Sequence, residues 1–400
     1  MSTVTLTNVN ALLPGEGLTE TSLRIEDGCI AGIGVDAPQT GKVVDGNGLM
    51  AMPGIVDIHG DAFERQIMPR ANVSFRLDVA LNDTDQQMIS NGITTAYHGV
   101  TFSWEPGLRG RENCERMLGG VAALQPYFGC DTRIHLRFET FNLDAVDDVI
   151  DWMNDGLFGI FAFNDHTPEI VDNLSNASHK VKRYTDRTGL SEDQFKALAQ
   201  SVYERRGDVT AAIGKLASAA RLNNVPQFSH DDRTPEMRRF YHELGCEVSE
   251  FPMNEETAEA ARILGNPIVL GAPNVMRGGS HNGAVNAADM IAQDLCNILA
   301  SDYYYPAQLI AAFRLVDDGV LDIERAWNLV SLNPARAAGL TDRGEIRIGQ
   351  RADLVLVDTA ETEFPRIVAT MTEGRMVHQT MDMSSTGRSG APQVSQRLSA

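Results

Sequence analysis

The first stretch able to carry chemistry is His59-Gly60-Asp61, which follows a Pro-Gly turn and a mostly apolar run. In an extended strand, residues two positions apart project to the same side, so His59 and Asp61 are predicted to lie together at the strand's C-terminal end. An imidazole beside a carboxylate is half of a divalent-metal site. The same pattern also fits a strand that merely ends in polar residues, so the rest of the chain decides between the two interpretations.

Acids and imidazoles recur at the ends of further predicted strands. These strands cover residues 55–61, 93–98, 132–139, 159–164, 225–230, 246–251, 267–272 and 297–302. A purely structural barrel has no reason to gather costly polar groups at one rim, so the pattern favours a metal or catalytic site. Metal-ligand roles are predicted for His59, Asp61, Glu139, His166, His230 and Asp302. His98 and His135 are interpreted as ordinary hydrogen-bonded residues.

Helical patterns separate these strands, for example at 112–124, 191–205 and 257–264. Short, nearly continuous apolar strands that alternate with helices are typical of a parallel sheet covered by helices. Eight such units predict an α/β fold, a (β/α)8 TIM barrel over residues 53–342. An open doubly wound sheet is disfavoured, because no Gly-rich phosphate loop follows the first of these strands.

The two ends of the chain are predicted to form a second domain. Residues 1–52 read as short strands and turns, and residues 343–380 form a matching β-rich segment. Because the first segment is too short to build a core alone, we expect the two to pair into a small β-sandwich domain. Residues 381–400 are rich in Ser, Gly, Gln and Arg and are predicted to be a disordered tail.

Composition limits the partners and the compartment. The net charge of −20 argues against a nucleic-acid-binding surface or an anionic-membrane surface. The five cysteines are scattered without a CxxC pair, which fits a reducing compartment. No basic-then-apolar leader and no run of 18 apolar residues occurs, so we expect a cytoplasmic protein.

Five arginines lie on or just after predicted strand ends. A planar guanidinium bonds two phosphate oxygens at once, so these residues suit a small anionic, phosphorylated substrate. Substrate-binding roles are predicted for Arg65, Arg70, Arg137, Arg233 and Arg277, and for the backbone of Gly278, Gly279 and Ser280. His281 is a candidate acid for the leaving group. The alternative is that several of these arginines only neutralise neighbouring acids.

Two stretches, PGIVDIHGD and GEIRIGQRADLVLVD, together with the split β-domain, resemble the amidohydrolase superfamily over residues 1–378. The resemblance implies a distorted barrel with one or two divalent metals, zinc first, with manganese or iron open. The stretches HGDAFERQIMPR, FNDHTP, SHDDRTPE and GAPNVMRGGSHNG resemble one branch of this superfamily, whose members act in phosphonate catabolism. That branch implies cleavage of a phosphoanhydride in a ribose 5-triphosphate phosphonate, with release of pyrophosphate.

The chain departs from the superfamily pattern at two positions. Asp61 stands where the first-strand motif usually has a second histidine, and Glu139 takes the place of a bridging carboxylated lysine. The superfamily usually supplies a histidine from each of the fifth and sixth strands, and here the sixth offers Glu250, which is therefore a rival to His166 as ligand. Asp302 is expected to orient a water molecule and take its proton.

Two other functions remain open at this point. The first is an amidohydrolase that cleaves a C–N bond of a cyclic amide or N-acyl substrate, which needs few cationic side chains. The second is a catalytically silent barrel, which predicts no bound metal. The resemblance is also compatible with a homo-oligomer.

Overall fold

The computed structural model describes residues 3–36, 41–70, 73–176, 178–278, 286–360 and 364–380. The predicted tail at 381–400 lies outside this part of the chain, as do the predicted site residues Gly279, Ser280 and His281. None of the helices in the described ranges is long and apolar enough to cross a membrane.

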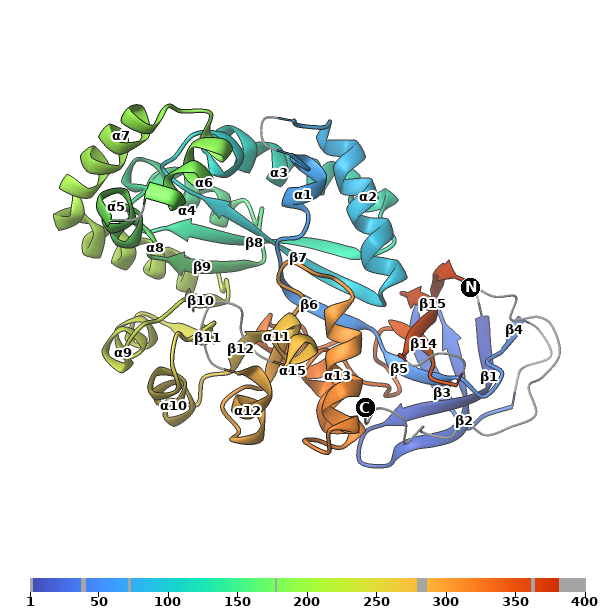
Figure 1. The fold of residues 1–400 in the computed structure, drawn as a ribbon. Helices are drawn as coiled ribbons and strands as arrows, with labels where there is room; N and C mark the ends of the chain where they lie inside the picture. Colours follow the sequence, from blue (N-terminus) through green and yellow to red (C-terminus); the bar gives the residue numbers. More distant parts are fainter. Residues whose placement is uncertain are drawn as a thin grey trace.

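Eight parallel strands form a nearly closed barrel, as predicted (Figure 1). They are β6 (Ile55–Gly60), β7 (Ile93–Phe102), β8 (Asp131–Glu139), β9 (Ile160–Asn164), β10 (Gln227–His230), β11 (Cys246–Glu250), β12 (Ile268–Gly271) and β13 (Ile298–Ala300). Neighbours in the sequence are neighbours in the sheet. One correction concerns β7, which continues four residues past the predicted end at His98.

Helices cover the outside of the barrel (Figure 1). They are α1 (Glu64–Ile67), α2 (Leu77–Ser90), α3 (Arg111–Leu124), α4 (Val146–Asn154), α8 (Val209–Leu222), α9 (Pro235–Glu243), α10 (Glu255–Ile263), α11 (Ala272–Arg277), α12 (Ala287–Ala292), α13 (Ala307–Asp317), α14 (Ile323–Asn328) and α15 (Leu332–Ala337). Buried side chains from α2, α3, α4 and α8 pack with the outward residues of β7, β8 and β9. The barrel's own interior holds a separate cluster that includes Val56, Phe228, Val248 and Val269. Outward and inward residues therefore alternate along the strands, as a barrel requires.

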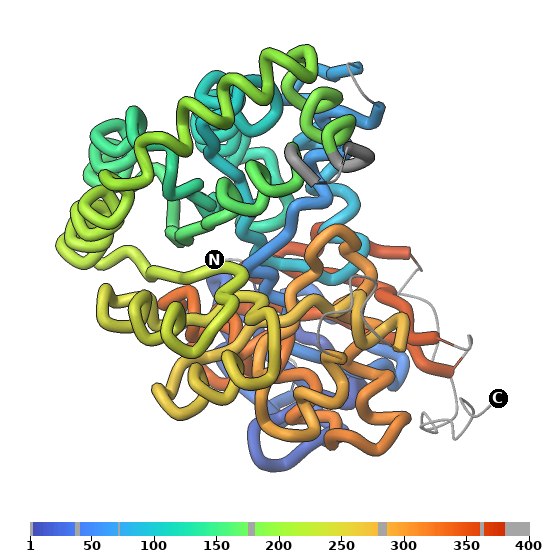
Figure 2. Tube along the Cα trace, turned by 60° about the vertical axis from the view of Figure 1, so that its left-hand side comes forward, coloured from blue at the N-terminus to red at the C-terminus, as the bar shows by residue number. Residues whose placement is uncertain are grey.

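Three helices follow β9 as an insertion: α5 (Thr167–Asn176), α6 (Ser178–Thr188) and α7 (Glu192–Glu204). They lie in the upper part of the views in Figures 1 and 2. Ile170, Tyr184, Phe195 and Ala199 give them a small core of their own. Arg187 fastens α6 to the barrel by donating to Glu105 at 2.9 Å.

Both chain ends meet in one mixed sheet beside the barrel (Figure 1). Its strands are β1 (Thr3–Leu13), β2 (Gly17–Glu26), β3 (Cys29–Ile33), β4 (Lys42–Asp45), β5 (Met50–Pro53), β14 (Leu354–Asp358), β15 (Arg366–Thr372) and β16 (Arg375–Gln379). β5 joins the two ends by pairing antiparallel with β14. Leu6 and Leu23 pack with Leu354 and Val368 in a shared core, so neither end buries its apolar face alone. The domain limits at residues 52 and 343 stay predictions.

Candidate metal centre

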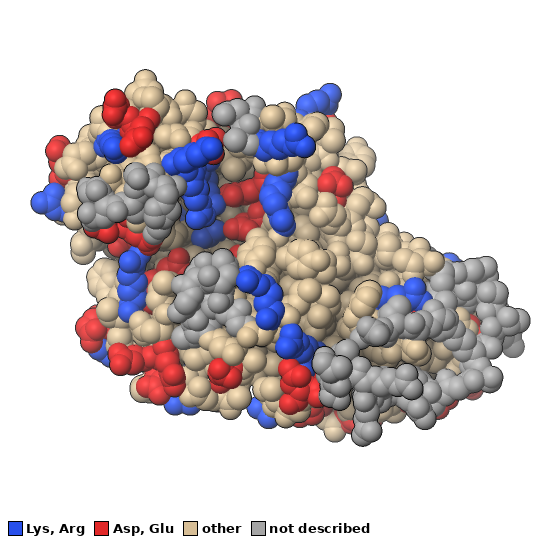
Figure 3. All heavy atoms as spheres, in the orientation of Figure 1, with Lys and Arg blue, Asp and Glu red and all other residues tan. Residues whose placement is uncertain are grey.

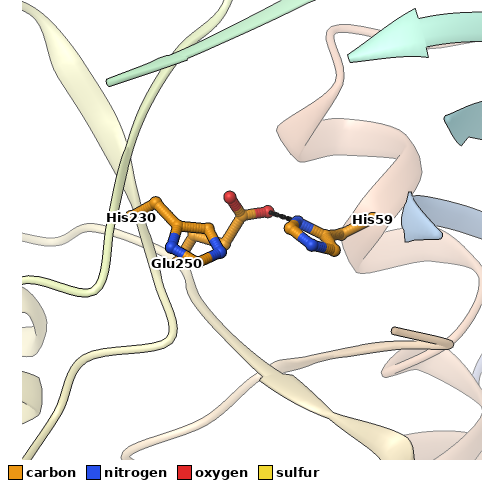
Figure 4. A group of neighbouring side chains, drawn as sticks. All are labelled: His59, His230 and Glu250. Atoms are coloured by element: carbon orange, nitrogen blue, oxygen red, sulfur yellow. Dashed lines mark hydrogen bonds and ion pairs between the residues drawn. The ribbon is translucent and has the colours of Figure 1, made fainter. Parts of the chain in front are cut away.

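Histidines and carboxylates converge at the C-terminal ends of the barrel strands, where TIM barrels carry their sites. Three groups have potential ligand atoms within 4.8 Å of one another; they are His59–His230–Glu250, His166–His230–Asp231 and His59–Asp61–Asp302. Figure 4 shows the first group, in which Glu250 reaches between the two imidazoles. The groups share members, so they form one continuous cluster.

A bulge in β6 aims His59 into this cluster. From Asp57 to Gly60, β6 advances three residues while the paired strand β7 advances two. Ile58 packs in the barrel interior, and its neighbour His59 also turns inward to meet Glu250. An extra residue of this kind breaks the simple alternation of a strand, and bulges recur beside active sites for that reason.

Three strand ends share an unusual backbone conformation. Asp231, Phe251 and Asp302 follow β10, β11 and β13, and each has a left-handed φ between 52° and 58°. Each still donates its N–H to a neighbouring strand, as Asp302 does to His59 O at 3.0 Å. Left-handed non-glycine residues are costly and gather at functional sites, so their presence at three strand ends supports a functional rim.

His59 is held as a neutral imidazole of defined tautomer. Burial, reinforced by Arg137, lowers the pKa of His59 to about 3. Its Nδ1 lies 2.8 Å from Glu250 Oε1, and both side chains are buried. A neutral ring beside a carboxylate must donate its proton there, which leaves the Nε2 lone pair available to a metal.

His230 has the complementary arrangement. Arg137 donates from Nη2 to His230 Nε2 at 3.1 Å, and a guanidinium is always a donor. The proton of this imidazole therefore sits on Nδ1, which lies 3.1 Å from Asp231 Oδ2. Arg137 also lies 3.9 Å from Asp61, so a buried cation occupies the middle of the cluster.

His166 is bonded at both ring nitrogens. Nδ1 lies 2.6 Å from Glu139 Oε1, and Nε2 lies 3.0 Å from Asp231 Oδ2. Burial alone would lower the pKa of His166, but the two carboxylates outweigh it and raise the pKa to about 10. Burial likewise opposes ionisation of Glu139, and His166 overrides it to hold the pKa of Glu139 at about 2.

Asp302 is set apart from the other acids by its proton affinity. Burial, followed by the neighbouring charge of Asp61, raises the pKa of Asp302 to about 7. The adjacent strand end is Gly271, where a Cβ would stand 3.3 Å from Asp302 Oδ2. The absence of a side chain there leaves room beside the Asp302 carboxylate.

The residues present fit a divalent ion. The three groups offer imidazole nitrogen and carboxylate oxygen, the donors that zinc, manganese and iron accept. Within the described part of the chain, Glu250 Oε2 is buried and has no hydrogen-bond partner. A bound ion or water is the usual partner of a buried carboxylate oxygen of this kind. The rim therefore has the charge and the donors of a metal site.

Most, but not all, of the predicted metal ligands belong to the three groups. His59, Asp61, His166, His230 and Asp302 all belong to the three groups, while Glu139 touches them through His166. Glu250, the rival ligand, lies with His59 and His230. Asp231 was missed, although it directly follows His230 in the sequence.

The two histidines interpreted as ordinary lie outside the three groups. His98 is on the outer side of β7 against Phe63, with ring centroids 4.9 Å apart. His135 Nδ1 lies 2.9 Å from the carbonyl oxygen of Ile58, in the barrel interior next to His59. Neither belongs to a candidate ligand group in the described residues.

Of the five predicted substrate arginines, Arg137 alone touches a candidate ligand among the contacts of the described residues. Arg65 donates to the carbonyl of Tyr303, directly after Asp302. Arg233 pairs with Glu169 at 2.8 Å, and Arg70 and Arg277 are exposed. Figure 3, in the orientation of Figure 1, shows a hollow in the surface with acidic atoms inside it and basic side chains along its edge.

Sequence comparison identifies the class of protein that this barrel and rim define. The family model described as "Amidohydrolase family" matches residues 202–378. A curated relative is 31% identical over 362 residues, which cover 88% of this chain and 94% of that protein. The chain belongs to the amidohydrolase family and is a hydrolase. Members of that family generally bind divalent metals.

The relative is the alpha-D-ribose 1-methylphosphonate 5-triphosphate diphosphatase of Escherichia coli (strain K12). Among solved structures, an amidohydrolase superposes with a TM-score of 0.66 at 17% identity, covering 95% of this chain and 100% of that one. The N-isopropylammelide isopropylaminohydrolase of Burkholderia multivorans ATCC 17616 superposes with a TM-score of 0.61 at 18% identity, covering 94% and 98%. At such identities the structures confirm the fold alone.

Proposed function

We propose that this protein is a metal-dependent diphosphatase of phosphonate catabolism. Its reaction is the hydrolysis of a phosphoanhydride in a ribose 5-triphosphate phosphonate, with release of pyrophosphate. The observation that carries the proposal is the relative of that activity, which aligns over 88% of the chain at 31% identity. The buried Arg137 supports it, because a cation in the centre of the rim suits an anionic substrate better than a neutral amide.

The metal, zinc by preference, would be held by His59, Asp61, His230 and Asp302, with His166 or Glu250 completing the set. When bound, a divalent ion lowers the pKa of water from about 15.7 to about 7 and offsets charge on phosphoryl oxygens. Glu139 is the candidate bridge if two ions are present, and it now contacts His166.

Asp302 is proposed to accept the proton of the attacking water. In the metal-free site, burial and the charge of Asp61 raise the pKa of Asp302 to about 7, so this carboxylate has a high affinity for a proton. A bound ion would lower that pKa and keep the group ionised as an acceptor. Its left-handed backbone turns the carboxylate toward His59 and Asp61. The water therefore has its acceptor on the same side as the candidate ligands.

Arg137 is proposed to bind a phosphoryl oxygen next to the point of attack. Its position between Asp61 and His230 is fixed by contacts at 3.9 and 3.1 Å. A guanidinium has five donors, so it can bond phosphate while it keeps one neighbour. Arg65, Arg70, Arg233 and Arg277 are proposed for the outer phosphates. The role of His281 as leaving-group acid, a cytoplasmic location and a homo-oligomer stay predictions.

The test is hydrolysis by protein loaded separately with zinc, manganese or iron. Pyrophosphate is measured from a ribose 5-triphosphate bearing a 1-phosphonate, and amide cleavage is measured from cyclic amides and N-acyl compounds. We expect pyrophosphate release that is lost in Asp302→Asn and kept in Glu247→Gln, an exposed acid on the outer part of β11. Turnover of the amides alone would overturn the proposal and favour the C–N hydrolase.

A further inference from the structure

The barrel closes at one short seam, between β6 and β13. β13 has only three residues, and the single bridge across the described seam joins Gly60 to Asp302. Two backbone hydrogen bonds flank that bridge: Asp302 N to His59 O at 3.0 Å, and Asp61 N to Asp302 O at 2.9 Å. The seam therefore runs directly through three candidate ligands from opposite ends of the barrel sequence.

A buried acid, Asp57, spans the same seam with its side chain. Asp57 Oδ1 accepts from Ser301 N at 3.0 Å and from His59 N at 3.4 Å. Asp57 Oδ2 accepts from Ser301 Oγ at 2.6 Å. The carboxylate takes the place of the backbone pairing that the three-residue strand is too short to supply. Of its two partners, His59 is a candidate ligand and Ser301 directly precedes the candidate ligand Asp302.

The packing around this carboxylate leaves little tolerance. A Cβ at Gly60 would stand 2.7 Å from Asp57 Oδ2, closer than side chains approach, and 3.2 Å from Ser301 Oγ, which is a tight contact. The same Cβ would stand 3.4 Å from Cε1 of the Tyr305 ring. Asp57 is thus held by its hydrogen bonds to Ser301 and to the N–H of His59, with Gly60 packed against Oδ2. A shift of its carboxylate would therefore move His59 or Ser301.

We propose that Asp57 is a positioning residue that sets the distance between the pair His59–Asp61 and Asp302. It does this through Ser301 and the backbone of His59, without touching substrate. The assignment rests on the proposed roles of these residues at the metal, and it deepens them by naming the group that aligns the first and last strands. Groups that orient metal ligands typically change metal affinity or activity by about 10–100-fold when removed.

The test uses Asp57→Asn, Ser301→Ala and the double variant in the full chain. An asparagine has the same size but cannot accept from both the N–H and the hydroxyl of Ser301. Each protein is loaded with cobalt(II), and its visible absorption, cobalt affinity and melting temperature are measured alongside pyrophosphate release. Asp85→Asn is the matched control, because Asp85 is also buried and accepts from Gly129 N and Cys130 N at about 3 Å, far from the seam.

We expect Asp57→Asn to change the cobalt spectrum and to weaken cobalt binding about 10–100-fold, with kcat falling more than KM rises. Ser301→Ala should move the same readouts in the same direction, and the double variant should add little to Asp57→Asn. Asp85→Asn should lower the melting temperature without changing the spectrum.

An unchanged spectrum and affinity in both seam variants would overturn the proposal and leave Asp57 a purely structural acid. If Asp57→Asn does not fold, the milder Ser301→Ala decides by the same readouts. A spectrum that changes in a protein whose wild type releases no pyrophosphate would refute the proposed reaction and still support the positioning role.

Discussion

Replacing Glu250 with glutamine tests how the rim holds His59. The contact between Glu250 Oε1 and His59 Nδ1 is 2.8 Å long and fully buried, and it joins a neutral imidazole to a carboxylate. Glutamine keeps the volume of the side chain, so the packing around Phe251 and His230 should survive. The substitution removes the negative charge of the acceptor, and it weakens the preference of the His59 proton for Nδ1 over Nε2.

The magnitude follows from that contact. A hydrogen bond to a charged group contributes about 1.5–3 kcal/mol and one between neutral groups about 0.5–1.5 kcal/mol, so the difference is about 1–1.5 kcal/mol. That corresponds to about 5–12-fold in metal affinity. A glutamine can also turn its amide NH2 toward His59, which would place the proton on Nε2 and block the lone pair. The loss should then approach about 100-fold, the upper range for groups that orient a ligand.

The assay is competition for zinc between the protein and a chelating dye, which gives affinity and stoichiometry together. Glu247→Gln is the control, because Glu247 lies on the same strand but is exposed and outside the three groups. We expect Glu250→Gln to keep its stoichiometry and to lose about 5- to 100-fold in affinity. Affinity within twofold of wild type would refute the orienting role. Loss of one whole ion per chain would instead identify Glu250 as a ligand.

Three further predictions concern the charges of the rim. Asp302→Asn should abolish pyrophosphate release with metal content largely intact, measured by metal analysis and turnover; retained turnover removes Asp302 as the base. Arg137→Lys should raise KM for the phosphorylated substrate by about 10–100-fold, because a lysine loses a charge-assisted bond of about 1.5–3 kcal/mol; an unchanged KM would place the phosphate elsewhere. In the metal-free protein, His166 has a pKa raised from 6.5 to about 10. Its contribution to stability is therefore fully present below pH 6.5 and lost as pH rises through 10. Melting temperatures across that range should fall less steeply in His166→Gln, and equal slopes would contradict the raised pKa.

The barrel strands could be predicted because each is a short apolar run between helical patterns. The exception is β7, where His98 suggested a strand end although the strand continues to Phe102. A polar residue such as His98 can lie inside a strand when its side chain packs against an aromatic ring, here that of Phe63. Pairing of the chain ends was also predictable, because residues 1–52 are too few to build a core alone.

The details of the site could not be predicted, because they depend on one-residue changes in the backbone. The bulge in β6 and the left-handed turn at Asp231 re-aim side chains without leaving a clear composition signal. Asp231 was missed for this reason, because the prediction took His230 alone from the end of the fifth strand. Glu250 is buried between two imidazoles only when β6, β10 and β11 lie in the correct register. The spacing of residues along the sequence does not reveal that register.

The balance of charge around His166 and Arg137 has a consequence for how the proposed metal would enter the site. An imidazolium bonded to Glu139 and Asp231, and a guanidinium bonded to Nε2 of His230, already satisfy two acids and one ring nitrogen of the rim. We therefore expect the chain to fold without an ion, unlike small domains that are unfolded without their metal. We expect loading to be an exchange that expels a proton and displaces Arg137 from His230. Which ion the protein carries is then decided after folding, by the metals and the acidity of its surroundings.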